Sequence, residues 1–175
     1  MGKLSDKKIA FILAPNDFSD EQYFQPKVLL QAQGAMIDTF SKNNPEEVTG
    51  IKGGKAHITA SLKELNPEEY DAIVIVGGKG AKKYFNDKKI HKIIKTFADA
   101  GKIISAISSG SVVLANAGVL SGKEVTSLDV NKSQLINKKA NWTDKKSVVD
   151  GNVITSQGSQ TSMDFGMQIV NSLAD

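Results

Sequence analysis

The sequence contains no cysteine, and this absence removes several classes of chemistry at once. Disulfide bridges, thiolate metal sites and a cysteine nucleophile are all excluded. The sequence also contains no arginine, because all 22 of its basic residues are lysine. The guanidinium group is the side chain that grips a carboxylate or phosphate with two parallel hydrogen bonds. Any anion bound by this chain must therefore rely on lysine, on backbone amides or on helix N-termini.

The sequence also has no long apolar run, a small net charge and only two histidines. No stretch approaches the roughly 20 apolar residues of a membrane span and no signal peptide is visible, so we expect a cytoplasmic protein without membrane contact. The net charge is only +3, and the lysines are scattered along the sequence, which argues against a nucleic-acid partner. With two histidines and no cysteine, we expect neither a metal site nor a cofactor.

What the sequence does contain is an alternation of apolar, strand-length runs with amphipathic segments. Strands are predicted at residues 7–14, 35–41, 71–76, 102–107 and 125–128, hairpins at 48–60 and 148–155, and helices at 20–34, 87–101, 109–117, 132–138 and 161–173. Buried strands that alternate with helices are typical of a parallel sheet covered on both faces. We therefore predict one doubly wound α/β domain over residues 1–175, with a mostly parallel sheet.

Apolar spacing predicts which face of two helices is buried. In the helix at 20–34, the apolar residues of one face are Phe24, Val28, Leu29 and Ala32. Pro26 lies several residues into this helix, so we expect the helix to start late or to bend there. In the last helix, we expect the buried residues to be Met163, Met167, Val170 and Leu173.

Two of the predicted strands end in turns of small residues. One is followed by Gly77 and Gly78, and the other runs into Ala106-Ile-Ser108-Ser109-Gly110, which has the small-x-Ser-x-Gly spacing of a nucleophile elbow. Ligands of open parallel sheets bind beyond the carboxyl ends of the strands. The amides near Gly78 and Ser109 could there form an oxyanion pocket. The simpler alternative is that both segments are only tight glycine and serine turns.

A serine nucleophile also needs a base, which is usually histidine. His57 falls in the predicted hairpin and His91 on a predicted surface helix, and no lysine is obviously placed near Ser108. A complete Ser-His-Asp hydrolase is therefore not favoured.

Three motifs resemble the ThiJ/PfpI superfamily, which has a flavodoxin-like, class I glutamine amidotransferase-like fold. They are the run from Asn66 to Gly78 (NPEEYDAIVIVGG), the elbow AISSG with the following AGVLSGKEVTS up to Ser127, and VDGNVITSQG from Val149 to Gly158. The resemblance covers nearly the whole chain. It implies a flavodoxin-like sheet with helices on both faces and a homo-oligomer, most simply a homodimer. The superfamily includes a deglycase/chaperone and an archaeal intracellular peptidase.

The departures from this pattern fall where the chemistry of the family is expected. By the resemblance, Ser108 stands at the position of the elbow cysteine, Ser109 at that of the next histidine, and Gln22 at that of the glutamate that bonds the thiol. Three further positions also differ: Val76 replaces proline, Gln157 replaces arginine, and a lysine near Lys82 replaces an acidic residue. A serine hydroxyl without a base is inert near neutral pH. The joint loss of three groups indicates natural divergence rather than an engineered Cys-to-Ser change.

Two functions follow as hypotheses. The first is a non-catalytic, stress-related or interacting protein that binds a small polar or anionic ligand in a pocket lined by Gln22, Gly77, Gly78, Ser108, Ser109, Gly110 and Gln157. The second is a serine-dependent hydrolase or lyase that uses Ser108, with peptidase-, glyoxalase- or deglycase-like chemistry.

Overall fold

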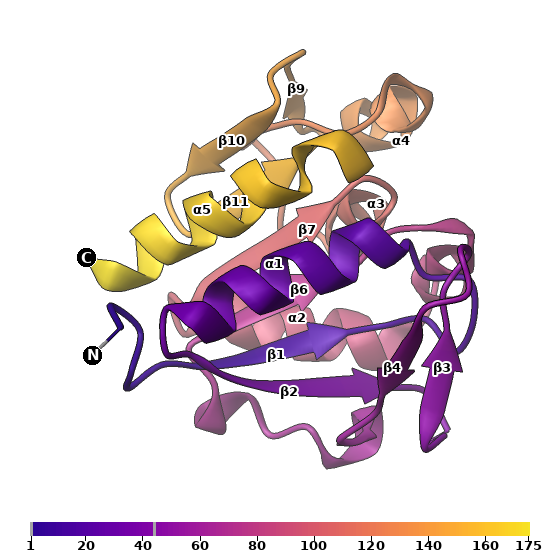
Figure 1. Cartoon of the computed structure of the whole chain (residues 1–175). Helices are drawn as coiled ribbons and strands as arrows, with labels where there is room; N and C mark the ends of the chain where they lie inside the picture. Colours follow the sequence, from indigo (N-terminus) through magenta and orange to yellow (C-terminus); the bar gives the residue numbers. More distant parts are fainter. Residues whose placement is uncertain (1, 44) are drawn as a thin grey trace.

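The computed structural model describes residues 2–43 and 45–175, which are built around one seven-stranded sheet (Figure 1). The strand order is β10-β11-β7-β6-β1-β2-β5. All neighbouring strands pair in parallel except β10 and β11, which form the predicted C-terminal hairpin. The strands are β1 (Lys8–Ile12), β2 (Met36–Ser41), β5 (Ala60–Ser61), β6 (Ala72–Ile75), β7 (Ile103–Ile107), β10 (Ser147–Asp150) and β11 (Val153–Ser156).

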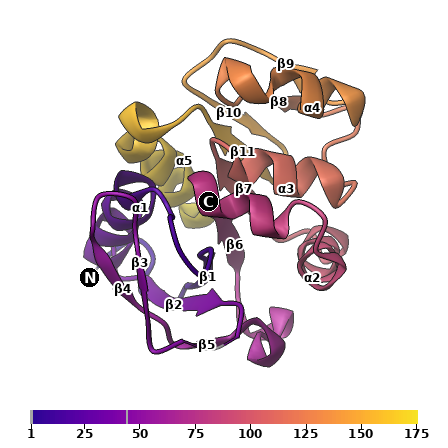
Figure 2. The same cartoon turned by 90° about the vertical axis from the view of Figure 1, so that its right-hand side faces the viewer.

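Helices cover both faces of this sheet, as the sequence predicts (Figure 2). One face carries α1 (Asp20–Ala32) and α5 (Ser162–Ala174), and the other carries α2 (Lys88–Asp99) and α3 (Gly110–Asn116). Alternate residues of β1 divide between the two cores: Ile9 and Phe11 face α1 and α5, whereas Ala10 and Ile12 face α2 and α3. This period of two is the pattern of a strand buried on both sides. The doubly wound, mostly parallel α/β fold is thereby confirmed.

The remaining elements lie outside the main sheet. The predicted hairpin at 48–60 is present as β3 (Glu47–Thr49) paired with β4 (Lys55–His57), and a second small sheet pairs β8 (Glu124–Val125) with β9 (Asn141–Trp142). The helix α4 (Lys132–Asn137) lies between β8 and β9 in the sequence. Among the described residues, every helix is too short or too polar to cross a bilayer.

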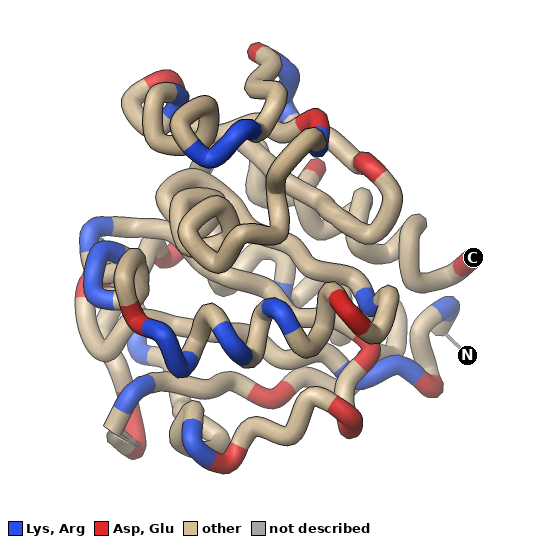
Figure 3. The backbone as a smooth tube through the Cα atoms, turned by 180° about the vertical axis from the view of Figure 1, so that it is seen from behind, with Lys and Arg blue, Asp and Glu red and all other residues tan. Residues whose placement is uncertain are grey.

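Asp87 fixes the start of α2, as predicted. Its carboxylate accepts hydrogen bonds from the amides of Lys89 at 3.0 Å and Ile90 at 3.4 Å, which satisfies two of the free donors of the first turn. The ammonium group of Lys42, which follows β2, lies 3.1 Å from the same carboxylate. Partial burial alone would raise the pKa of Asp87, but these hydrogen bonds and the charge of Lys42 outweigh it and lower the pKa. Lysines recur along α2, in blue in Figure 3.

The buried face of α1 differs from the prediction. Val28 is 63% exposed and Ala32 is also exposed, whereas the buried residues are Gln22, Tyr23, Pro26 and Leu30. The helix begins at Asp20 and runs through Pro26, so the expectation of a late start is wrong. Its buried side packs closely on α5, where a Cβ added to Gly166 would lie 3.2 Å from the Cα of Pro26. The apolar spacing missed this face because it contains glutamine and proline.

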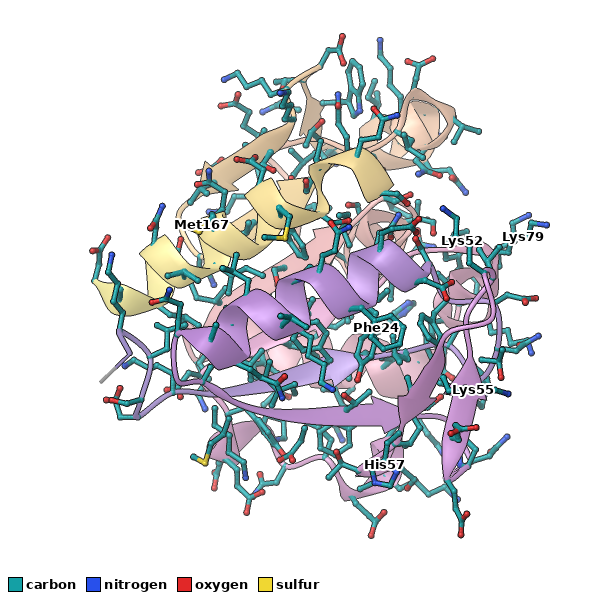
Figure 4. The ribbon with its side chains drawn as sticks, in the orientation of Figure 1. Phe24, Lys52, Lys55, His57, Lys79 and Met167 are labelled. Carbon is teal, nitrogen blue, oxygen red and sulfur yellow. The ribbon has the colours of Figure 1, made fainter. Side chains whose placement is uncertain are left out.

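The methionines of α5 are a second correction. We expected Met163 and Met167 to be buried, but they are 50% and 41% exposed, and Met167 points outward from α5 in Figure 4. The buried stripe is instead centred on Phe165, Ile169 and Leu173, which repeat at four-residue spacing. Val170 and Leu173, the other two residues that we expected to be buried, are 1% and 8% exposed, so that part of the prediction is confirmed.

The Lys42–Asp87 pair predicts how stability changes with pH. Asp87→Asn keeps the helix cap but removes the ion pair, which we expect to cost about 0.5–1 kcal/mol of unfolding free energy at pH 7. Because the pKa of Asp87 is lowered on folding, its contribution is present above the ordinary value of 3.8 and is lost as the pH falls through the lower folded value. Urea unfolding of both proteins between pH 7 and pH 2 measures this difference. A gap of constant size across that range contradicts it.

Candidate functional site

The candidate site is the turn between β7 and α3, which has the backbone geometry of a nucleophile elbow. Ser108 has a φ of 56°, in the left-handed region that costs a residue with a side chain about 1–3 kcal/mol. Its amide donates to the carbonyl oxygen of Ser156 at 3.0 Å. Its carbonyl oxygen accepts from the Ser127 hydroxyl at 2.8 Å and the Ser111 amide at 3.0 Å. These bonds hold the strained residue from three sides.

Gly110 is required by the close approach of α3 to β6. A Cβ at this position would lie 2.4 Å from the carbonyl oxygen of Ile75, so only glycine allows the helix to begin here. The close contact between α3 and β6 therefore explains why the elbow has a glycine at position 110.

The side chain of Ser108 is buried and has no base beside it. Ser108 is 5% exposed, and within residues 2–43 and 45–175 the structure gives its hydroxyl no hydrogen bond to a His, Lys, Asp or Glu side chain. His57 lies on β4 at the lower edge of Figure 4. His91 is occupied elsewhere, because its Nε2 lies 3.0 Å from the Phe85 carbonyl oxygen. Neither histidine is bonded to the elbow.

Gln22 lies beside the elbow but bonds to the glycine turn rather than to Ser108. Its Oε1 accepts a hydrogen bond from the Gly77 amide at 3.0 Å, and its Nε2 donates to the Ser159 hydroxyl at 3.4 Å. The side chain is 3% exposed. A Cβ at Gly77 would lie 2.5 Å from Gln22 Oε1, so the glycine is what admits the amide group. Gln22 therefore links α1 to the turn after β6 and to the segment before α5.

Ser109 bonds both polar groups of Gly78. Its hydroxyl accepts from the Gly78 amide at 3.1 Å and donates to the Gly78 carbonyl oxygen at 3.0 Å. The amides of Gly77 and Gly78 are thus both bonded to side chains of the site itself. The expected oxyanion pocket must be corrected, because it would need the Gly78 amide free to face a substrate. Of the predicted pair of donors, only the Ser109 amide has no hydrogen-bond partner among the described residues.

The other predicted site residues lie apart from this group. Gln157 donates through Nε2 to Asp144 Oδ1 at 2.8 Å, which directs its side chain toward the loop before β10. Lys82 lies on the 3₁₀ segment Lys79–Tyr84 and lines a hollow beside Lys42. The structure therefore brings Gln22, Gly77, Gly78, Ser108, Ser109 and Gly110 together, but it does not join Gln157 or Lys82 to them by a hydrogen bond.

Four polar residues of the site were missed in the sequence. Ser19 and Ser159 bond to each other through their hydroxyls at 3.1 Å, and Asn131 donates to Ser127 at 3.0 Å. Ser127 belongs to a motif that was singled out, but its role depends on a contact across 19 positions. Nothing in the local pattern marks the other three. Among the described residues, no group of three His, Asp or Glu side chains is placed to hold a metal ion.

Comparison with known proteins gives the family. The model of the DJ-1/PfpI family matches residues 7–172, which is nearly the whole chain. The chain belongs to the DJ-1/PfpI family. The resemblance seen in the three sequence motifs is thereby confirmed.

Curated relatives of this DJ-1/PfpI protein include archaeal sequences of similar length. An uncharacterised protein of Methanocaldococcus jannaschii is 36% identical over 173 residues, covering 97% of this chain and 84% of the relative. A protein of Pyrococcus furiosus named deglycase PfpI is 32% identical over 152 residues, covering 86% of this chain and 89% of the relative.

Two solved structures of the family share the fold over nearly their whole length. A ThiJ/PfpI domain protein from Brachyspira murdochii superposes with a TM-score of 0.93 at 32% identity, covering 98% of each chain. Drosophila melanogaster DJ-1beta gives a TM-score of 0.88 at 28% identity, covering 99% of this chain and 91% of that one.

The strained backbone at the elbow can be measured by substitution. Ser108→Gly removes the cost of a side chain at a φ of 56°, so we expect it to raise the free energy of unfolding by about 1 kcal/mol. Ala115→Gly, inside α3, is the control and should lower it by at least about 0.5–1 kcal/mol. Urea denaturation measures both. Equal destabilisation by the two glycines would show that the turn stores no strain.

Proposed function

We propose that this protein is a non-catalytic member of the DJ-1/PfpI family, which binds or interacts rather than turning over a substrate. The observation that carries the proposal is the pairing within the elbow. Gln22 and Ser109 occupy the amides of Gly77 and Gly78, and the Ser108 hydroxyl has no base among its described hydrogen-bond partners. The nucleophile therefore has no activating base among those partners, and of the two expected oxyanion donors only the Ser109 amide is free.

The chemistry of glutamine supports the same reading. A glutamate at position 22 could carry a proton or a negative charge beside the elbow, whereas the amide of Gln22 can do neither. The buried Gln22 instead satisfies a backbone amide, which is a structural task. Three Pyrococcus relatives are named deglycases, and those names do not assign a reaction to this chain.

A serine-dependent hydrolase or lyase is the alternative, and one observation favours it. Ser108 keeps the left-handed backbone of an elbow, and its hydroxyl is not committed to another side chain. A substrate that supplied its own proton acceptor could then react there.

Comparison of the wild type with Ser108→Ala separates these two functions. We expect both proteins to show the same rate, at the level of the buffer, with methylglyoxal, a p-nitrophenyl ester and a fluorogenic peptide. Peptide mass spectrometry should find no acyl or glycosyl adduct on Ser108 of the wild type. The Pyrococcus furiosus relative named a deglycase serves as the positive control with methylglyoxal. A wild-type rate above background that Ser108→Ala abolishes overturns the non-catalytic proposal.

We also propose that two copies of the chain associate through the outer sides of α1 and α5. Val28, Met163 and Met167 are exposed there, and a shallow groove of about 390 Å³ lies between the helices, lined by Phe24, Gln25, Val28, Leu29, Ala32 and Met163. An exposed apolar patch of this kind marks an interaction surface. A second copy is the occupant that we propose, because an apolar patch is complementary to itself across a two-fold axis, and the family resemblance implies a homo-oligomer.

Lysine substitutions test this dimer. In sedimentation velocity, the wild type should sediment as a dimer, and Val28→Lys combined with Met163→Lys should sediment as a monomer that remains folded by circular dichroism. Val130→Lys is the matched control, because Val130 is 79% exposed and does not line the groove, and it should leave the dimer intact. A monomeric wild type, or a dimer that survives the double substitution, contradicts the proposal.

A further inference from the structure

A cavity of about 650 Å³ lies away from the elbow, beyond the carboxyl ends of β2 and β5. The segments that form it follow these strands or begin α2, and their apolar residues are Leu62, Leu65 and Ile93. Leu65 is buried, and Leu62 and Ile93 pack against the core below α2. The volume is within the range of roughly 300–1,000 Å³ for small-molecule sites. None of the elbow residues lines it.

Lysines surround this cavity. Lys42, Lys63, Lys89 and Lys92 line it, and an adjoining hollow that shares Lys42 and Lys89 adds Lys82, Lys83 and Lys88. The only carboxylate in either lining is Asp87. Seven lysines and one aspartate carry a formal charge of +6, twice the +3 of the whole chain. Seven of the 22 lysines thus lie around one site, although along the sequence the lysines look scattered.

Most of the positive charge of this site is not neutralised by a neighbouring carboxylate. Asp87 is paired with Lys42. Across residues 2–43 and 45–175, the structure places no carboxylate within 4 Å of the ammonium groups of Lys63, Lys89 and Lys92. Asp87 also occupies two amides at the start of α2. An anion in the cavity would therefore be held by ammonium groups and not by the helix N-terminus.

We propose that this cavity binds a small organic polyphosphate, of the class of a nucleoside triphosphate. The phosphates would pair with Lys63, Lys89 and Lys92, and the organic part would lie against Leu62 and Ile93. Lysine binds phosphate as a point charge, and in a chain without arginine several lysines must converge to hold a polyanion. A wall of leucine and isoleucine beside those charges selects a ligand with an apolar part over a bare inorganic anion.

The shape of the site favours a small molecule over a nucleic-acid strand. Single-stranded nucleic acids bind along extended basic grooves with aromatic side chains on which the bases stack. Here the charges surround one concave cavity, and no residue lining it is aromatic. We therefore assign the site to a free polyphosphate and make the oligonucleotide a competing outcome of the test.

Binding of ATP, measured by isothermal titration calorimetry at low and high salt, tests this proposal. Lys89→Gln combined with Lys92→Gln should weaken ATP binding at least about tenfold, since hydrogen bonds to charged groups contribute about 1.5–3 kcal/mol each. Lys3→Gln combined with Lys138→Gln removes the same charge from exposed positions outside the cavity. This control should leave ATP binding within about twofold of the wild type.

Four results would overturn the proposal. The first is no binding of ATP to the wild type at millimolar concentration. The second is an equal loss of affinity in the two double variants, which would show a general effect of net charge. The third is inorganic pyrophosphate binding as tightly as ATP, which would exclude a role for the apolar wall. The fourth is displacement of ATP by a single-stranded oligonucleotide of lower dissociation constant. None of these results depends on whether Ser108 is catalytic.

Discussion

The backbone turn at Ser108 is held by hydrogen bonds that come from other segments of the chain. The amide of Ser108 reaches β11, and its carbonyl oxygen is bonded by the Ser127 hydroxyl across 19 positions. The start of α3 meanwhile approaches the Ile75 carbonyl so closely that Gly110 has no room for a side chain. These contacts tie β6, β7, β11 and the segment after β8 to one point. The glycine turn after β6, which bonds to Gln22 and Ser109, lies beside this turn.

The backbone geometry of the elbow does not depend on a catalytic side chain at position 108. The contacts that enforce a φ of 56° at Ser108 are made by backbone groups and by Ser127, so they do not require a thiol. Gln22 and Ser109 accept hydrogen bonds from the amides of Gly77 and Gly78, which lie beside the turn. Buried amides without partners cost about 1–3 kcal/mol each, so polar side chains at these two positions stabilise the turn whether or not a substrate is bound.

Sequence reasoning succeeded where a local pattern has one physical cause. The apolar runs, the helix range from residue 87 and the small residues around Ser108 each predicted the element that is found. Sequence reasoning failed where packing between distant elements determines which residues are buried or paired. The buried face of α1 contains Gln22 and Pro26, and α5 buries Phe165 rather than Met163. The pairing of Gln22 with Gly77 spans 55 positions, and the lysine cavity is lined by three separate segments, so neither leaves a periodic signal.

The central claim is that the Ser108 hydroxyl is not an activated nucleophile, and a serine-directed probe tests it most directly. The protein is incubated with a fluorophosphonate at neutral pH, and its intact mass is measured, with a serine hydrolase in the same tube as the positive control. The account predicts complete labelling of the hydrolase and an unchanged mass for this protein. A mass increase that maps to Ser108 by peptide sequencing would contradict the account.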